Sequence, residues 1–232
     1  FFAIFLALLL PTLASAKLDP ITRNRRMQDA SQAFQAGKYD EARKIYYDVY
    51  VEDGDTVSKE LFDRGKKGHE VLLVAFMDEK NGLYALAIEK YEHILKLNPL
   101  DPQIQPLIGD TKTKLYAQLL QESKDLYREG KYTDAQSTLS EYLLQTGVTD
   151  IELLTSINQC IELNDKAKHA IQQKEYTEAI KCYNSILEIN PTDIITTKAV
   201  AALEAKSKRS VSASVKSTLV VKTKVSRSSY CR

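Results

Sequence analysis

The residues of this chain best suited to covalent or metal chemistry are three cysteines and three histidines. A cysteine thiolate can act as a nucleophile, and thiolates and imidazoles are common zinc ligands. No two cysteines have CxxC spacing, and no histidine has a cysteine or another histidine at ligand spacing. We therefore expect no metal site and no cofactor. These six residues are Cys160, Cys182, Cys231, His69, His93 and His169.

Catalysis by other residues has little support. The sequence contains no GxSxG, HExxH, P-loop or Rossmann motif. Its carboxylates are plentiful, but on amphipathic helices such residues usually form the solvated face. Glu41 and Glu178 are interpreted in this way. We expect a protein that is not an enzyme and has no catalytic residues.

The composition favours helices as the elements that position all of these residues. Hydrophobic residues make up 44% of the 232-residue chain and charged residues 27%, whereas there are only 8 glycines and 6 prolines. Long uninterrupted helices are easily built from such a sequence, and a turn-rich β-fold is not. The fold class expected is all-α.

One phrase occurs four times along the chain. It reads QAGKYDEA at 35–42, NGLYALA at 81–87, EGKYTDA at 129–135 and QKEYTEA at 173–179. When the copies are aligned on their tyrosine, a small residue stands nine positions before it, an alanine three after it and a large residue seven after it. These positions are Ala30, Ala75, Ser123 and Ala167; Ala42, Ala87, Ala135 and Ala179; and Tyr46, Tyr91, Leu139 and Tyr183.

This pattern resembles the tetratricopeptide repeat, a helix–turn–helix unit of 34 residues. The resemblance implies a right-handed superhelical solenoid of four hairpins, because a single hairpin cannot bury its apolar face alone. Small residues would let the paired helices approach closely, and Gly37, Gly82 and Gly130 would permit the turns. The repeat domain spans 17–205, with units at about 23–56, 68–101, 116–149 and 160–193 and a capping helix at 194–205.

The chain departs from the family pattern in the spacing of its units. The aligned tyrosines are 45, 48 and 44 residues apart. The extra residues precede the first helix of the later units, at 57–67, 102–115 and 150–159, and their sequences read as helix. We therefore expect the first helix of each later hairpin to be lengthened to about 24 residues or more.

The same register makes a disulfide between Cys160 and Cys182 unfavourable. The two residues would lie on different helices at heights that differ by about 9 Å. Cys182 stands beside Tyr183 on its helix, so a packed thiol is favoured over a nucleophile.

The resemblance also implies a docking groove on the inner face of the first helices. The alternative is that these residues only contact the lengthened helices. Co-chaperone repeats of this family hold a terminal carboxylate with several Lys, Arg and Asn residues, and that clamp is not assembled here. The groove candidates are Met27, Ser31, Phe34, Phe76, Lys124, Tyr127, Asn164 and Lys168.

The N-terminal segment 1–16, FFAIFLALLLPTLASA, is typical of a signal peptide that has lost its first residues. Its apolar run is too short to span a bilayer comfortably, and it ends in an A-x-A cleavage pattern. The alternatives are a buried helix or an uncleaved anchor. We expect export with cleavage after Ala16 and no stable membrane span afterwards. The bacterial periplasm or cell envelope is the favoured location, and secretion is the alternative.

The charge is distributed unevenly. All 31 acidic residues lie at or before Glu204, whereas residues 206–232 contain eight Lys or Arg and no acid. This Ser-rich basic segment is either a flexible tail or the start of a further, truncated domain. Its charges could attract an anionic surface or simply solvate a linker. Aromatic residues are scarce in it, so nucleic acid is not an expected partner.

Together these features predict a non-enzymatic scaffold that binds a protein or peptide partner in its inner groove. One alternative is a targeting arm of a larger envelope enzyme whose catalytic domain lies beyond Arg232. The other is a self-assembly module, which would form a homo-oligomer.

Overall fold

The structure is a computed structural model that describes residues 17–148 and 151–208. The expected signal peptide and most of the basic tail lie outside these residues. The described part is helical and contains no strand, which confirms the all-α fold class. It divides into two compact units on either side of a boundary between Leu115 and Tyr116, inside one long helix.

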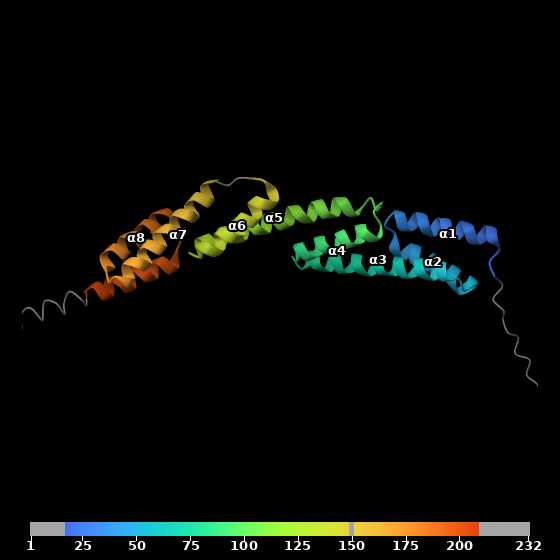
Figure 1. Ribbon diagram of the computed structural model, residues 1–232, viewed down its shortest axis with the longest axis horizontal. Coiled ribbons are helices and arrows are strands. Elements are labelled where there is room, and N and C mark those ends of the chain that lie inside the picture. Colours follow the sequence, from blue (N-terminus) through green and yellow to red (C-terminus); the bar gives the residue numbers. More distant parts are fainter. Residues whose placement is uncertain (1–16, 149–150, 209–232) are drawn as a thin grey trace, which may run out of the picture. The chain divides into compact units, whose positions relative to one another are not determined.

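Eight helices have defined bounds, and a further helical segment covers 194–208 (Figure 1). The helices expected to be lengthened contain 25, 25 and 22 residues. The other five helices contain 14 to 16 residues. The bounds are α1 Pro20–Gln35, α2 Tyr39–Asp53, α3 Thr56–Lys80, α4 Tyr84–Leu97, α5 Ile104–Arg128, α6 Tyr132–Thr146, α7 Ile151–Gln172 and α8 Tyr176–Ile189.

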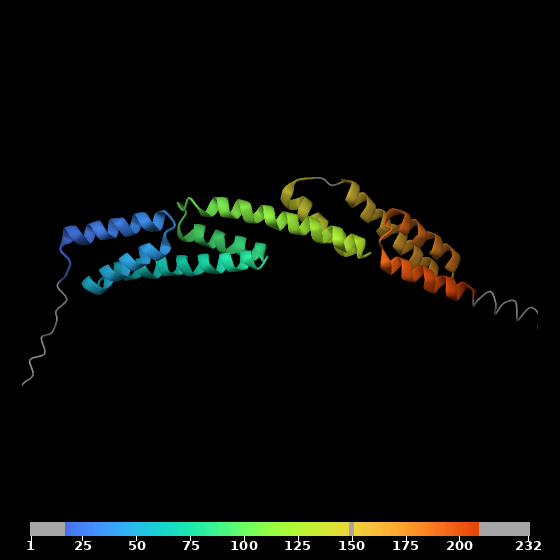
Figure 2. The ribbon, with the colours of Figure 1, turned by 180° about the vertical axis from the view of Figure 1, so that it is seen from behind.

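In the first unit, α2 and α4 follow one another along the same long helix, α3. Figures 1 and 2 show α2 beside the first half of α3 and α4 beside its second half. The approach of α2 is close, because a Cβ at Gly65 would lie 3.2 Å from Arg43 Cβ and one at Gly68 would lie 2.7 Å from the Tyr39 ring. Two glycines on one face of α3 therefore let α2 pack against it.

The small residues of the repeated phrase form the centre of each helix pair. Ala30 and Ala42 are fully buried between α1 and α2, and Ala75 and Ala87 are fully buried between α3 and α4. The second unit is built in the same way around Ala167 and Ala179. This burial is the expected consequence of close helix approach.

The four turns share one backbone geometry. At the first turn, Gly37 N–H donates to Phe34 C=O at 3.0 Å and Lys38 N–H donates to Ala33 C=O at 2.9 Å. This pair of bonds is the Schellman motif, whose penultimate residue has positive φ. That residue is Gly37, Gly82, Gly130 and Lys174 in turn, with φ values of 77°, 76°, 79° and 64°. Lys174 is thus a non-glycine residue in a conformation that favours glycine.

None of the described helices combines the length and the apolar composition needed to cross a bilayer.

Candidate protein-interaction surface

A buried hydrogen-bond cluster joins the first turn to the end of the second hairpin. The Tyr39 hydroxyl donates to Asp101 Oδ2 at 2.5 Å, and Asn98 Nδ2 donates to Phe34 C=O at 2.7 Å and to the Tyr39 hydroxyl at 3.2 Å. Asp101 also accepts from the N–H of Gln103 at 2.9 Å, close to the start of α5. We call this cluster the clasp of the first unit.

The second unit contains the same clasp, formed by Tyr132, Asn190 and Asp193. Tyr132 donates to Asp193 Oδ2 at 2.6 Å, and Asn190 Nδ2 donates to Tyr127 C=O at 2.6 Å. Asp193 then caps the 194–208 helix by accepting from Thr196 N–H at 2.8 Å. The Asn-Pro segments of the sequence therefore do more than end a helix, because each supplies the Asn and Asp of a clasp.

A backbone carbonyl at the C-terminus of the helix before each clasp accepts a side-chain hydrogen bond, and the donor differs between the two units. In the second unit the Tyr127 hydroxyl donates to Ile189 C=O at 3.1 Å. In the first unit Phe34 replaces this tyrosine and has no hydroxyl. Arg64 instead donates to Leu97 C=O while its guanidinium lies 4.9 Å from the centre of the Phe34 ring.

Burial raises the pKa of the Tyr39 hydroxyl well above its usual range, and the hydrogen bond to Asp101 raises that pKa further. The same two causes, in the same order, raise the pKa of Tyr132. Both hydroxyls are therefore held as neutral donors, and the clasps are structural rather than acid–base groups.

Most of the groove candidates from the first unit pack within the chain. Phe34 is buried in an edge-to-face contact with Tyr39, with ring centres 5.2 Å apart. Met27 is partly buried beside Ser58 of α3, whose hydroxyl lies 3.5 Å from the Met27 sulfur. Ser31 lines a small cavity of about 190 Å³ with Phe34. The first half of α3 thus covers the inner face of the first hairpin.

The inner face of the second hairpin is covered in part by α5. Lys114 of α5 forms an ion pair with Glu79 at 2.5 Å, and Glu79 also accepts from the Tyr91 hydroxyl at 2.7 Å. The hydrogen bond and charge of Lys114 lower the pKa of Glu79. Phe76 is 43% exposed and touches Tyr91 edge-on, so it is the groove candidate with the largest exposed aromatic surface.

The groove candidates in the second unit also make contacts within the chain. Tyr127 is half-buried by its contacts in the clasp. Lys124 and Asn164 are half-buried, and Lys168 is exposed and forms an ion pair with Asp165 at 3.3 Å. Four of the eight candidates lie in the first unit and four in the second.

Cys160 and Cys182 are both buried free thiols. Burial raises the pKa of Cys160 to about 11. A thiol with this pKa is almost entirely protonated at neutral pH and is a poor nucleophile. Within the described residues, no group of three or more His, Cys, Asp or Glu is arranged to hold a metal ion.

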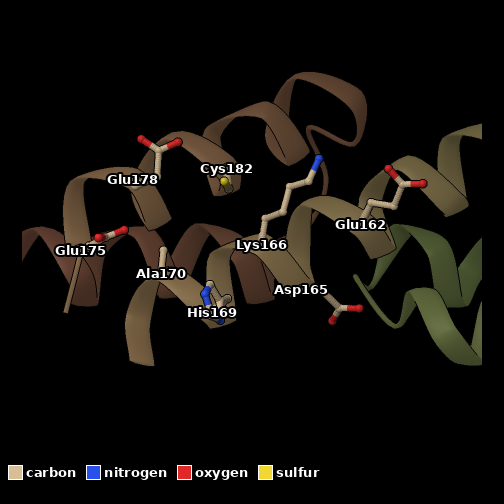
Figure 3. Close-up of a pocket in the computed structure, with 8 residues that line it drawn as sticks. All are labelled: Glu162, Asp165, Lys166, His169, Ala170, Glu175, Glu178 and Cys182. Atoms are coloured by element: carbon tan, nitrogen blue, oxygen red, sulfur yellow. The ribbon is translucent and has the colours of Figure 1, made fainter. Parts of the chain in front are cut away.

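Another surface of the hairpins stays open to solvent. Between α7 and α8 it forms a groove of about 660 Å³, with Ala170 and Cys182 at its base (Figure 3). Six polar residues line it. Glu162 lies farthest from the turn in the sequence; the other five stand at fixed positions relative to the turn tyrosine, and we call these five positions of each hairpin its open face. In the fourth hairpin they are Asp165, Lys166, His169, Glu175 and Glu178.

The corresponding positions of the first and third hairpins are also polar. In the third hairpin, four of the five line a similar groove of about 570 Å³. The four turns have the same hydrogen bonds, and the residues at these positions are exposed in every hairpin. These residues are Gln28, Asp29, Gln32, Lys38 and Glu41 in the first hairpin, and Gln121, Glu122, Asp125, Lys131 and Asp134 in the third.

The second hairpin is the exception, because all five of its open-face residues are apolar. They are between 43% and 63% exposed, although their counterparts in the other three hairpins are charged or polar. A contiguous exposed apolar surface of this kind is typical of an interaction site. These residues are not among the groove candidates, although the apolar run VLLVAFM at 71–77 is longer than one buried helix face requires and is a signal for them. The five residues are Leu73, Val74, Met77, Leu83 and Leu86.

Comparisons with known proteins give no relative. No family model, no curated protein and no solved structure matches this chain.

Proposed function

We propose that the chain is a non-enzymatic protein–protein interaction scaffold of the tetratricopeptide type. The observation that carries this proposal is the apolar open face of the second hairpin. Five exposed apolar residues occupy positions that are polar in the other three hairpins. Isolated exposed apolar residues are common, but five at adjoining positions of one hairpin indicate a surface that a protein partner covers.

The proposal places partner binding on the open face rather than on the inner face. Inner-face residues such as Phe34 and Glu79 already contact the next long helix. An apolar face formed by two antiparallel helices suits an amphipathic helix or another helical surface. Four tetratricopeptide-like hairpins, arranged as a right-handed superhelix, would present such faces at intervals along the chain.

A matched pair of variants of the full chain tests this proposal. Leu83→Glu/Leu86→Glu introduces the residues that the fourth hairpin has at the same positions, Glu175 and Glu178, so the hairpin should keep its fold. Leu144→Glu is the control, because Leu144 on α6 is 83% exposed and lies outside the open face. Cross-linking in an envelope extract should yield a protein adduct with the wild type and the control, and at least about tenfold less with the double variant. Equal yields from all three proteins, with helicity unchanged, would refute the proposal.

We further propose that the scaffold is exported to the bacterial periplasm or cell envelope. Support comes from the apolar segment 1–16 with its A-x-A pattern. Cell fractionation followed by N-terminal sequencing tests this proposal, and we expect the mature chain to begin at Lys17. Recovery from the cytosol with the apolar segment intact would refute it.

A further inference from the structure

The exposed residues of α3 form a seam of the kind found in coiled coils. Glu70, Leu73, Met77 and Lys80 are separated by three, four and three residues, which places them along one side of the helix. All four are exposed; Leu73 is 50% and Met77 63% exposed. Leu83 and Leu86 widen the apolar strip on the side of α4. The seam is therefore apolar at its centre and charged at its two ends.

The order of residues in this seam is complementary to itself. If a second α3 packs antiparallel across a two-fold axis midway between Leu73 and Met77, Leu73 of each copy meets Met77 of the other. The same operation places Glu70 of each copy opposite Lys80 of the other, which gives two ion pairs related by symmetry. A two-fold interface requires a surface that is complementary to itself.

We propose that the partner on this open face is a second copy of the chain, joined in an antiparallel dimer through α3. This inference rests on the proposed function, because it names the occupant of the same surface. Two features favour it over an unrelated partner, namely the reversed order of the charges and the apolar centre they enclose. The fourth hairpin lacks both features. The equivalent positions of its first helix, α7, are Glu162, Asp165, His169 and Gln172.

The dimer is expected to be weak. A standard stable interface buries roughly 800 Å² on each partner, and the five partly exposed side chains of the open face supply less apolar surface than that. Association should therefore depend on protein concentration and, because two ion pairs contribute, on ionic strength.

Sedimentation velocity of the full chain over a wide concentration range tests the inference. We expect a reversible monomer–dimer equilibrium. Leu73→Asp/Met77→His, which introduces the residues of the α7 seam, should weaken dimerisation at least about tenfold. Leu144→Asp, the matched surface control, should leave it unchanged. A monomer at every concentration, or a dimer that the seam variant does not affect, would overturn the inference.

A charge exchange tests the antiparallel pairing itself. Glu70→Lys alone should weaken the dimer, because it places two lysines opposite each other, and Lys80→Glu alone should weaken it for the corresponding reason. The double variant Glu70→Lys/Lys80→Glu should restore the wild-type dissociation constant. Failure of this restoration would contradict the pairing. If the chain is monomeric but Leu83→Glu/Leu86→Glu still abolishes cross-linking to another protein, the inference fails and the scaffold proposal stands.

Discussion

The Tyr39 hydroxyl lies 2.5 Å from a carboxylate oxygen of Asp101, although 62 residues separate them in the sequence. Tyr132 and Asp193 repeat this relationship at 2.6 Å across 61 residues. In each unit the turn of one hairpin is thus fixed to the segment that follows the next hairpin. This contact is possible because the two short helices follow one another along a single long helix.

Removal of the clasp hydroxyls should destabilise the protein. Tyr39→Phe or Tyr132→Phe leaves a buried aspartate without one of its donors, at an expected cost of about 1–3 kcal/mol in the free energy of unfolding. Urea denaturation followed by circular dichroism measures this cost. Tyr47→Phe is the control, because Tyr47 is 49% exposed, and should change stability by less than about 0.5 kcal/mol. Equal effects of the clasp and control variants would show that the clasp contributes nothing.

The turn glycines provide a matched comparison. Gly82→Ala should cost about 1–2 kcal/mol, because alanine disfavours positive φ and no atom lies within 4 Å of the new Cβ. Gly130→Ala has the same φ cost, but its Cβ would also clash with the Asp193 carboxylate. We expect Gly130→Ala to be more destabilising by at least about 1 kcal/mol. Equal losses in denaturation experiments would contradict the clasp geometry.

A substitution in the turn at Lys174 should stabilise the folded protein. This lysine has a φ of 64°, where the other three turns have glycine. Lys174→Gly removes the conformational strain, although it increases the entropy of the unfolded chain. We expect a net stabilisation of about 0.5–1 kcal/mol, measured as a higher urea midpoint. A lower midpoint would mean that the lysine side chain makes a compensating contact.

Alkaline pH should weaken the folded state. The pKa values of Tyr39 and Tyr132 are raised in the folded protein by burial and by their aspartate partners, whereas an unfolded tyrosine titrates near pH 10. The stability that these groups contribute is therefore fully present below about pH 10 and is lost as the pH rises toward the folded values. Tyr39→Phe/Tyr132→Phe should show a flatter decline in stability above about pH 10. An unchanged slope would contradict the raised pKa values.

The helices and their lengths could be predicted from the sequence because their signals are local. The recurrent tyrosine phrase marks each turn, and the spacing of 45, 48 and 44 residues requires longer first helices. The buried alanines follow from the same alignment, since close helix packing requires small side chains at fixed positions.

The clasps and the open face are harder to predict because they depend on the packing of distant segments. The pairing of Tyr39 with Asp101 requires the stagger of α2 and α4 along α3, which no local pattern encodes. One signal was available, namely that Asn-Pro-x-Asp follows the second and fourth hairpins. Phe34 shows the same dependence on packing, because its size predicts an anchor for a partner, whereas its contacts with Tyr39 and Arg64 could be seen only in the structure.

Site-specific photo-cross-linking from Met77 tests the central claim most directly. A photoreactive residue at Met77 samples the apolar open face of the second hairpin, and one at His169 samples the equivalent position of the fourth. We predict a specific adduct from position 77 and at least about tenfold less from position 169. Its mass should be twice that of the chain if the partner is a second copy. No adduct from position 77, or equal yields from both positions, would contradict the claim that this face binds a protein.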